Sequence, residues 1–258
     1  MNQNSGRKRG FSLIELSVVL VIIGLLIGGL VIGRDIIRNS NLQSVVANIN
    51  SFQNGLKLFQ EKYRYLPGDF PQATTIWASG VGCASNTTST TETCNGDGDG
   101  FISSVSAPTT ANTLSNENYY AWKHLSNAGF VDVQFDRFDY GRAGSKLGDA
   151  IFTIFHTPGQ SGTSGVFDGK YGTIITLGAT YTNNTYPAFN EALTGTDALS
   201  IDQKIDDSRP GTGNVMTFTT QTGSPVPGCA SSNVATSATY NISSANTPNC
   251  SLIFKTGY

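Results

Sequence analysis

The sequence lacks the motifs of the common catalytic sites. Its 258 residues contain no Gly-x-Ser-x-Gly nucleophile elbow, no phosphate-binding glycine-rich loop and no His-Glu-x-x-His metalloprotease motif. The only two histidines, His124 and His156, stand alone, so no zinc site with close ligand spacing is expected. Packing or loop structure explains each histidine better than acid–base chemistry does. We therefore predict that the protein is not an enzyme.

Basic residues are scarce as well. The chain has 16 Lys and Arg against 18 Asp and Glu, and three of the basic residues lie together at Arg7, Lys8 and Arg9. Nucleic-acid binding requires clustered positive charge that neutralises phosphates. Beyond these three residues the chain has 13 basic and 18 acidic residues, so a nucleic-acid partner is not expected.

Proline is absent before Pro67, which leaves room for one long helix at the N-terminus. In the 23 residues from Phe11 to Gly33, Glu15 is the only ionisable one, and about 20 apolar residues in a helix cross a bilayer core. The next segment is amphipathic, with one apolar stripe at alternating spacings of three and four: Leu42, Val45, Ile49, Phe52, Leu56, Phe59 and Tyr63. We expect one helix from Phe11 to about Arg64, whose first half spans a membrane and whose second half packs against the chain's own domain.

Glu15 is an unusual residue for a membrane-spanning segment. An ionised side chain at the centre of such a helix costs about 2.5–3.5 kcal/mol on insertion scales. No cationic residue lies within a helical turn of Glu15 on either side. Its partner should come from another molecule, or from the α-amino group that cleavage after Gly10 would create on Phe11. The alternative is that Glu15 extends from the helix end to the lipid headgroups.

The run Gly10-Phe11-Ser12-Leu13-Ile14-Glu15, between a short basic leader and an apolar helix, resembles the class III signal of type IV prepilins and type II secretion pseudopilins. The resemblance implies that a prepilin peptidase cuts after Gly10 and that Phe11 is then N-methylated. It also implies that Glu15 pairs with the N-terminal amine of a neighbouring subunit during assembly on an inner-membrane platform.

On this resemblance the protein is a structural subunit of a type IV pilus or a type II secretion pseudopilus. Its partners would be copies of itself and other pilins or pseudopilins. The alternative is a membrane-anchored exported adhesin or calcium-binding enzyme that does not polymerise. The basic leader predicts the orientation, because positive charge stays on the cytoplasmic side of a membrane. The domain would then lie outside the cytoplasm, anchored in the bacterial inner membrane, and after assembly in a periplasmic pseudopilus or a cell-surface pilus.

The exported part is predicted to be a β-rich domain with long loops. A short helix is expected over 115–127, and alternating apolar patterns predict strands over 150–155, 171–177, 214–219 and 251–255. A long helix followed by an antiparallel sheet gives an α+β fold. The predicted division of the chain is a leader at 1–10, a spanning helix at 11–33, its amphipathic continuation at 34–65 and the domain at 66–258.

All the cysteines follow the apolar helix, at Cys83, Cys94, Cys229 and Cys250. Since exported domains are oxidised, we expect structural disulfides. Three pairings are possible. The two local loops Cys83–Cys94 and Cys229–Cys250 are the simplest, because each would close a segment that has few apolar residues.

One acidic loop has the pattern of the first half of an EF-hand calcium loop. The candidate ligands are the side-chain oxygens at alternate positions and the backbone carbonyl that follows: Asn95, Asp97, Asp99 and Phe101. The closing glutamate is missing, because position twelve of the loop is Ser106, and Glu117 is a candidate to replace it. The loop therefore predicts either a structural calcium ion or a metal-free Asn/Asp/Gly turn.

A second acidic group consists of Asp202, Asp206 and Asp207. At helical spacing Asp202 and Asp206 share a face, with Lys204 and Arg209 nearby. Capping and surface ion pairing are the favoured explanation, and a second calcium site is the alternative.

Overall fold

The computed structural model describes most of the chain and divides it into two units, Met1–Asn41 and Leu42–Tyr258. The described residues are 12–77, 93–103, 117–132, 143–157, 167, 169, 171–179, 188–218, 228–232, 234–242 and 247–258.

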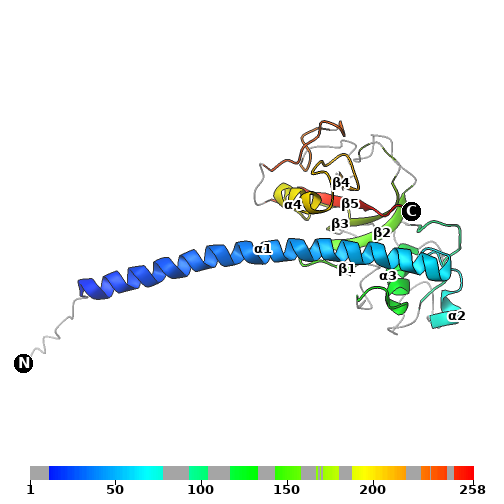
Figure 1. Cartoon of the computed structure of the whole chain (residues 1–258), viewed down its shortest axis with the longest axis horizontal. Helices are drawn as coiled ribbons and strands as arrows, with labels where there is room; N and C mark the ends of the chain where they lie inside the picture. Colours follow the sequence, from blue (N-terminus) through cyan, green and yellow to red (C-terminus); the bar gives the residue numbers. More distant parts are fainter. Residues whose placement is uncertain are drawn as a thin grey trace, which may run out of the picture. The chain divides into compact units, whose positions relative to one another are not determined.

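Helix α1 (Leu13–Tyr63) belongs to both units (Figure 1). It ends where Arg64 adopts a left-handed conformation with φ of 66°, shortly before Pro67, a residue that cannot continue a helix. The prediction of one helix ending near Arg64 is confirmed. Its predicted first residue, Phe11, lies outside the described part of the chain.

The second half of α1 packs against the domain through the predicted stripe. Six of its residues are at most 4% exposed: Leu42, Val45, Ile49, Phe52, Leu56 and Phe59. The Phe52 ring meets the rings of Trp122 and Phe152 edge to face, at centroid distances of 4.7 and 5.2 Å. Burying an apolar side chain of this size stabilises a fold by about 1.5–3 kcal/mol. The expected packing of this half against the chain's own domain is confirmed.

The domain contains a five-stranded antiparallel sheet in the order β1-β2-β3-β5-β4. The strands are β1 (Ala143–Gly144), β2 (Ile151–Thr157), β3 (Gly172–Gly178), β4 (Val215–Phe218) and β5 (Ser251–Lys255). Strands β2 and β3 pair along their full length, with Ile154 opposite Ile175. Four strands lie where alternation predicted them. The two-residue β1 is too short to show an alternating pattern.

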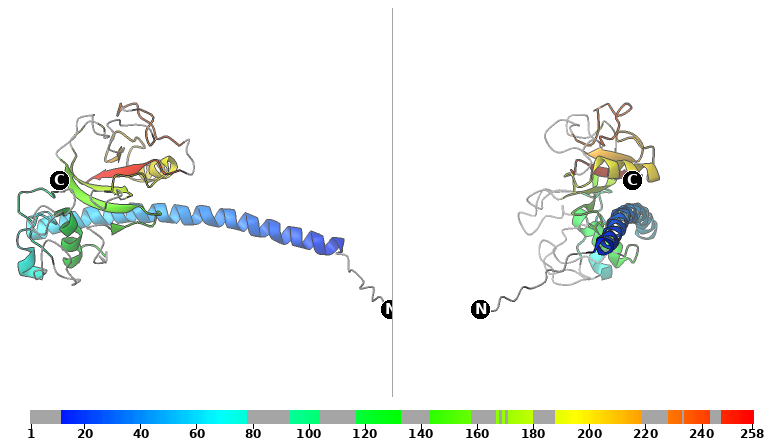
Figure 2. Two further views of the ribbon diagram at one scale, coloured as in Figure 1. Left: turned by 180° about the vertical axis from the view of Figure 1, so that it is seen from behind. Right: turned by 90° about the vertical axis from the view of Figure 1, so that its left-hand side faces the viewer.

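Apolar side chains cover both faces of the sheet. Both views of Figure 2 show the second half of α1 running beside the sheet. Successive strand residues point to opposite faces, so Ile154 joins one cluster and Phe155 the other. The first cluster contains the stripe of α1 together with Trp122 and Ile201. The second cluster includes Met216. This burial on both sides explains the nearly continuous apolar sequence of the central strands.

Three further helices complete the described part: α2 (Ala73–Trp77), α3 (Glu117–Asn127) and α4 (Gly195–Ile205). Helix α3 matches the predicted short helix, whose expected start at 115 lies outside the described residues. Thr194 caps α4, and its Oγ1 accepts the backbone N–H of Asp197 at 3.2 Å. The α+β fold is confirmed, and the four-part division of the chain stays a prediction.

Candidate functional site

Helix α1 begins with a reciprocal capping arrangement that includes Glu15. The backbone N–H of Ser12 donates to Glu15 Oε2 at 2.9 Å, and the N–H of Ile14 donates to Ser12 Oγ at 3.3 Å. This resembles the Ser-x-x-Glu capping box, except that the Ser12 hydroxyl accepts the N–H of Ile14 rather than that of Glu15. It satisfies backbone donors that have no partner within the helix. Glu15 thus has a local partner in Ser12, which the spacing of the two residues in the sequence indicates. The cleavage site at Gly10 and Phe11 lies outside the described residues.

The first half of α1 exposes apolar side chains over most of its surface. Leu13, Leu25 and Leu30 are 88%, 72% and 68% exposed. Within the described residues, α1 is the one helix that is long and apolar enough to cross a membrane. Continuous apolar surface of this extent is typical of lipid or protein contact. The helix is therefore consistent with a membrane-anchored, exported protein.

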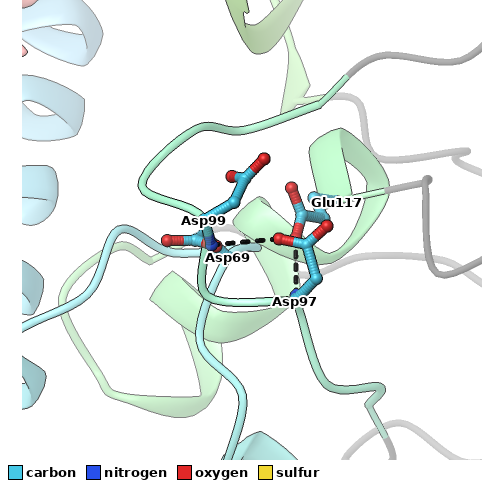
Figure 3. A group of neighbouring side chains, drawn as sticks. All are labelled: Asp69, Asp97, Asp99 and Glu117. Carbon is cyan, nitrogen blue, oxygen red and sulfur yellow. Dashed lines mark hydrogen bonds between the residues drawn. The ribbon is translucent and has the colours of Figure 1, made fainter.

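Four carboxylates from separate segments converge in the second unit (Figure 3). Asp69 lies in the turn after α1, Asp97 and Asp99 lie in the loop that follows α2, and Glu117 is the first residue of α3. One oxygen atom of each carboxylate lies within 4.8 Å of the others. We call these four residues the acidic cluster.

The turn after α1 is held against α3 by Gly68 and His124. The N–H of Gly68 donates to His124 Nδ1 at 2.8 Å, so the ring proton sits on Nε2, which faces the Cys94 carbonyl at 2.9 Å. Burial lowers the pKa of His124 to about 4, which keeps the ring neutral. A Cβ at Gly68 would lie 2.4 Å from the carbonyl oxygen of Glu117, so only glycine permits this approach. These contacts place Asp69 beside the start of α3.

The loop is folded by its own carboxylates. Asp97 Oδ1 accepts the N–H of Asp99 at 3.1 Å, and Asp99 Oδ1 accepts the N–H of Phe101 at 2.8 Å. Glu117 reaches into the same loop, where its Oε1 accepts the N–H of Asp97 at 2.9 Å and its Oε2 accepts the N–H of Ser103 at 3.0 Å. Glu117 therefore connects the start of α3 to the loop at two points, Asp97 and Ser103.

The buried members of the cluster resist ionisation. Asp69 and Glu117 are both 0% exposed. Burial raises the pKa of Asp69 to about 7, and the nearby Glu117 carboxylate adds to the rise. Burial also raises the pKa of Glu117, against hydrogen bonds from Ser103 and Asp97 that lower it. Asp69 Oδ2 accepts the N–H of Gly100 at 3.1 Å, whereas Oδ1 has no hydrogen-bond partner among the described residues.

The cluster differs from the ligand set expected from the sequence. Asp97 and Asp99 lie in it, and so does Glu117, the candidate for the missing position. Asn95 instead accepts the N–H of Thr74 through Oδ1 at 2.8 Å. The N–H of Phe101 donates to Asp99 Oδ1, while the expected ligand of this residue is its carbonyl oxygen. Ser106 lies outside the described residues. Sequence reasoning missed Asp69, because no local spacing connects the turn after α1 with this loop.

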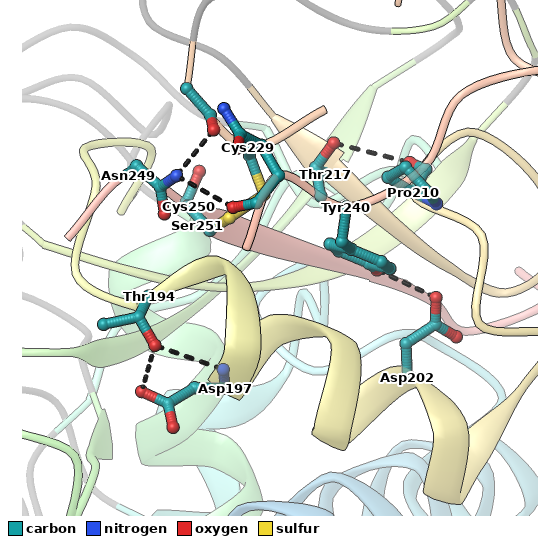
Figure 4. Close-up of a disulfide and its surroundings, with 12 residues drawn as sticks. Thr194, Asp197, Asp202, Pro210, Thr217, Cys229, Tyr240, Asn249, Cys250 and Ser251 are labelled. Atoms are coloured by element: carbon teal, nitrogen blue, oxygen red, sulfur yellow. Dashed lines mark hydrogen bonds between the residues drawn. A yellow bond between two sulfur atoms is a disulfide. The ribbon is translucent and has the colours of Figure 1, made fainter. Parts of the chain in front are cut away.

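The carboxylates of the second acidic group accept hydrogen bonds from nearby segments, and Figure 4 shows the one between Asp202 and Tyr240. Asp202 is buried at 0% exposure, and its Oδ2 accepts the hydroxyl of Tyr240 at 2.8 Å. Burial raises the pKa of Asp202 to about 6. Asp206 follows α4, and its Oδ2 accepts the N–H of Val215 at 3.1 Å, while Asp207 Oδ1 accepts a backbone N–H two residues on at 2.9 Å. The contacts of Asp206 and Asp207 agree with the expected capping, whereas Asp202 is buried against Tyr240 and is not part of a surface ion pair. The alternative of a second calcium site stays a prediction.

A disulfide joins Cys229 to Cys250, across 21 residues (Figure 4). The side chain of the adjacent Asn249 donates to the carbonyl of Gly228 and, at 3.3 Å, to that of Asn241. The cross-link therefore ties the segment before β5 to the loop that packs beside it. The other expected pairing, Cys83–Cys94, includes a residue outside the described part of the chain.

Comparison with known proteins identifies the N-terminal segment. Residues 5–31 match the family model described as the prokaryotic N-terminal methylation motif, which is the class III signal of type IV pilins and pseudopilins. The chain carries that signal, and the resemblance of its first residues is confirmed. A signal of this kind implies assembly with other pilins and processing by a prepilin peptidase, and it is typical of structural, non-enzymatic proteins. No curated protein and no solved structure matches the chain.

Proposed function

We propose that the protein is a structural subunit of a type IV pilus or a type II secretion pseudopilus, cut after Gly10 and N-methylated at Phe11. The match of residues 5–31 to the N-terminal methylation motif carries this proposal. The exposed apolar surface of the first half of α1 supports it, since a bundle of such helices buries that surface.

Glu15 has a specific part in this proposal. Cleavage creates a positively charged amine on Phe11, and Glu15 of an adjacent subunit neutralises it in the apolar filament core. Breaking a buried ion pair by removing one partner costs about 3–5 kcal/mol, because an uncompensated charge remains. The capping bond from Ser12 keeps the Glu15 carboxylate at the helix start until assembly supplies the amine.

The proposal assigns partners and a location. The partners are copies of this chain, other pilins or pseudopilins, a prepilin peptidase and an inner-membrane assembly platform. The domain lies outside the cytoplasm, and the protein acts through assembly rather than catalysis. The filament is a periplasmic pseudopilus or a cell-surface pilus.

Intact-mass measurement tests the processing step. Protein purified from a host with its cognate peptidase should begin at Phe11 and carry one methyl group. The Gly10→Ala variant should keep its leader, because the peptidase requires the glycine in this proposal. A wild-type chain that retains its first ten residues would contradict the proposal and favour a membrane-anchored protein that does not polymerise.

A second experiment separates assembly from helix capping. Glu15→Ala removes the carboxylate, whereas Ser12→Ala removes only the hydroxyl that accepts the N–H of Ile14. If Glu15 pairs with a neighbour's amine, Glu15→Ala should reduce incorporation into sheared filaments by on the order of 100-fold or more. Ser12→Ala should assemble nearly as well as wild type, because a lost cap costs only about 1 kcal/mol. Equal defects in the two variants would leave Glu15 with a capping role alone.

A further inference from the structure

The acidic cluster places four carboxylates close together in and beside the buried part of the domain. Asp69 and Glu117 are completely buried, and Asp97 and Asp99 place two further carboxylates beside them. The charged neighbours that move the pKa of Asp69 are Glu117 and Asp99, and both are acidic. A buried carboxylate takes up a proton unless hydrogen-bond donors or a positive charge offset its lost hydration.

Asp69 provides an observation that is independent of the clustering. Its side chain is buried, it contributes an oxygen to the cluster, and Oδ1 lacks a hydrogen-bond partner among the described residues. Leaving a buried carboxylate oxygen without a partner costs at least the desolvation of that atom. Buried polar atoms of this kind normally have a protein, water or ion partner.

The ligand atoms indicate the class of ion. All four groups are carboxylates, and hard oxygen ligands favour calcium and magnesium over zinc or copper. Calcium accepts six to eight oxygen ligands in variable geometry, so four carboxylate oxygens leave positions for backbone carbonyls and water. Magnesium demands a nearly octahedral arrangement and retains its water more strongly.

We propose that a calcium ion binds Asp69, Asp97, Asp99 and Glu117 and joins three segments: the turn after α1, the loop and the start of α3. The site shares Asp97 and Asp99 with the loop pattern in the sequence. In place of Asn95 and the Phe101 carbonyl it has Glu117, the candidate from the sequence, and Asp69, which only the fold brings near. Calcium modules outside the cell commonly have Kd values of about 10⁻⁴–10⁻³ M, so a site of this class fills only where free calcium is high.

Arg64 is the competing source of positive charge. It lines a hollow of about 330 Å³ together with Asp69, Asp99 and Gly100. If the guanidinium neutralises the cluster, calcium has nothing left to stabilise. A calcium titration therefore distinguishes the ion from the side chain.

The experiment measures the thermal unfolding of the full chain in detergent micelles, followed by near-ultraviolet circular dichroism. Calcium chloride is compared with EGTA at matched ionic strength, with magnesium chloride as a second arm. At free calcium about 30-fold above Kd, the Tm of wild type should rise by about 4–8 °C. Magnesium should produce a smaller rise.

Two variants and one control make the result specific. Asp69→Asn keeps an oxygen for the N–H of Gly100 but loses the buried charge, so it should match or exceed wild type in EGTA and lose the calcium response. Asp99→Asn changes an exposed residue of the cluster and keeps an oxygen for the N–H of Phe101, so the variant should fold as wild type does. It should weaken the apparent calcium affinity by about tenfold or more. Asp149→Asn, at an exposed aspartate outside the cluster, should respond to calcium as wild type does.

Three results would each overturn the proposal. The first is a wild-type Tm that calcium leaves unchanged, which would assign neutralisation of the cluster to protons or to Arg64. The second is an equal rise with magnesium. The third is a calcium response that survives in both Asp69→Asn and Asp99→Asn. None of these results bears on cleavage after Gly10, so the proposed function is tested separately.

Discussion

The first half of α1 exposes its apolar side chains, whereas the second half of the same helix buries them. Leu26 is 62% exposed and Leu56 is 0% exposed. The difference lies in the sequence pattern, since one half is apolar on all sides and the other carries a single stripe between polar residues. A helix that is apolar all round needs an apolar environment all round. Among the described residues, the chain supplies apolar contacts only to the stripe of the second half.

The two units also differ in the environment of their carboxylates. Glu15 is exposed and caps the start of the helix, so a simple backbone contact satisfies it. Asp69, Glu117 and Asp202 in the second unit are buried, and burial raises the pKa of each. Charge in the first unit is available to another molecule. The buried carboxylates of the second unit are stabilised by protonation and hydrogen bonds or, in our proposal, by calcium.

Truncation of a core residue should produce the largest difference between the halves. Phe59 is 0% exposed, and its ring lies 6.0 Å from that of Phe70 and 6.2 Å from that of Trp77. Phe59→Ala should lower the free energy of unfolding by about 3–5 kcal/mol and the Tm by about 6–20 °C. Leu26→Ala should change unfolding by less than about 0.5 kcal/mol. Similar Tm changes in the two variants, measured by circular dichroism in detergent, would show that the first half also contributes to the core.

A lysine placed in each half of α1 should affect membrane insertion only in the first half, whereas truncation affects folding only in the second half. Ile22 and Leu58 have similar exposures of 51% and 47%. Ile22→Lys should weaken membrane insertion by about 2.5–3.5 kcal/mol, because it places a charge within the apolar segment. Leu58→Lys should leave insertion unchanged, since this residue belongs to the domain half. The measurement is the fraction of protein that stays with membranes after alkaline extraction. Equal retention of the two variants would mean that the first half does not span a bilayer.

Local patterns predicted most of the fold. The stripe from Leu42 to Phe59 and the alternation in β2, β3 and β5 are visible within a few residues, so these elements were predicted near their observed bounds. The five residues of α2 and the two of β1 are too short to carry a period.

The acidic cluster was only partly predictable. Asp97 and Asp99 form one local motif, and Glu117 was a candidate because it follows the loop. Asp69 joins them only because Gly68 meets His124 and the start of α3, a contact that depends on tertiary packing. The capping role of Glu15, by contrast, is visible in its three-residue spacing from Ser12, although the sequence prediction considered only a cationic partner.

Titration of Asp202 should give the smallest effect and should be confined to the second unit. Burial raises the pKa of Asp202 from 3.8 to about 6, and the Tyr240 hydroxyl and the Asp206 and Asp207 carboxylates are its neighbours. Because the folded-state pKa is raised, protonation favours the native state. This contribution to stability is complete below about pH 4 and is lost as the pH rises through about 6.

Asp202→Asn keeps an acceptor for Tyr240 and removes the ionisation. The variant should therefore gain about 1–3 kcal/mol over wild type at pH 7, and this gain should vanish near pH 4, as measured by urea unfolding across the range. Asp149→Asn is the matched exposed control, and retention in membranes should not change in either variant. A loss of stability in Asp202→Asn at pH 7 that is absent at pH 4 would instead show that the ionised carboxylate of Asp202 stabilises the fold. The second unit would then stabilise an ionised carboxylate in its interior, whereas the first unit exposes the carboxylate of Glu15.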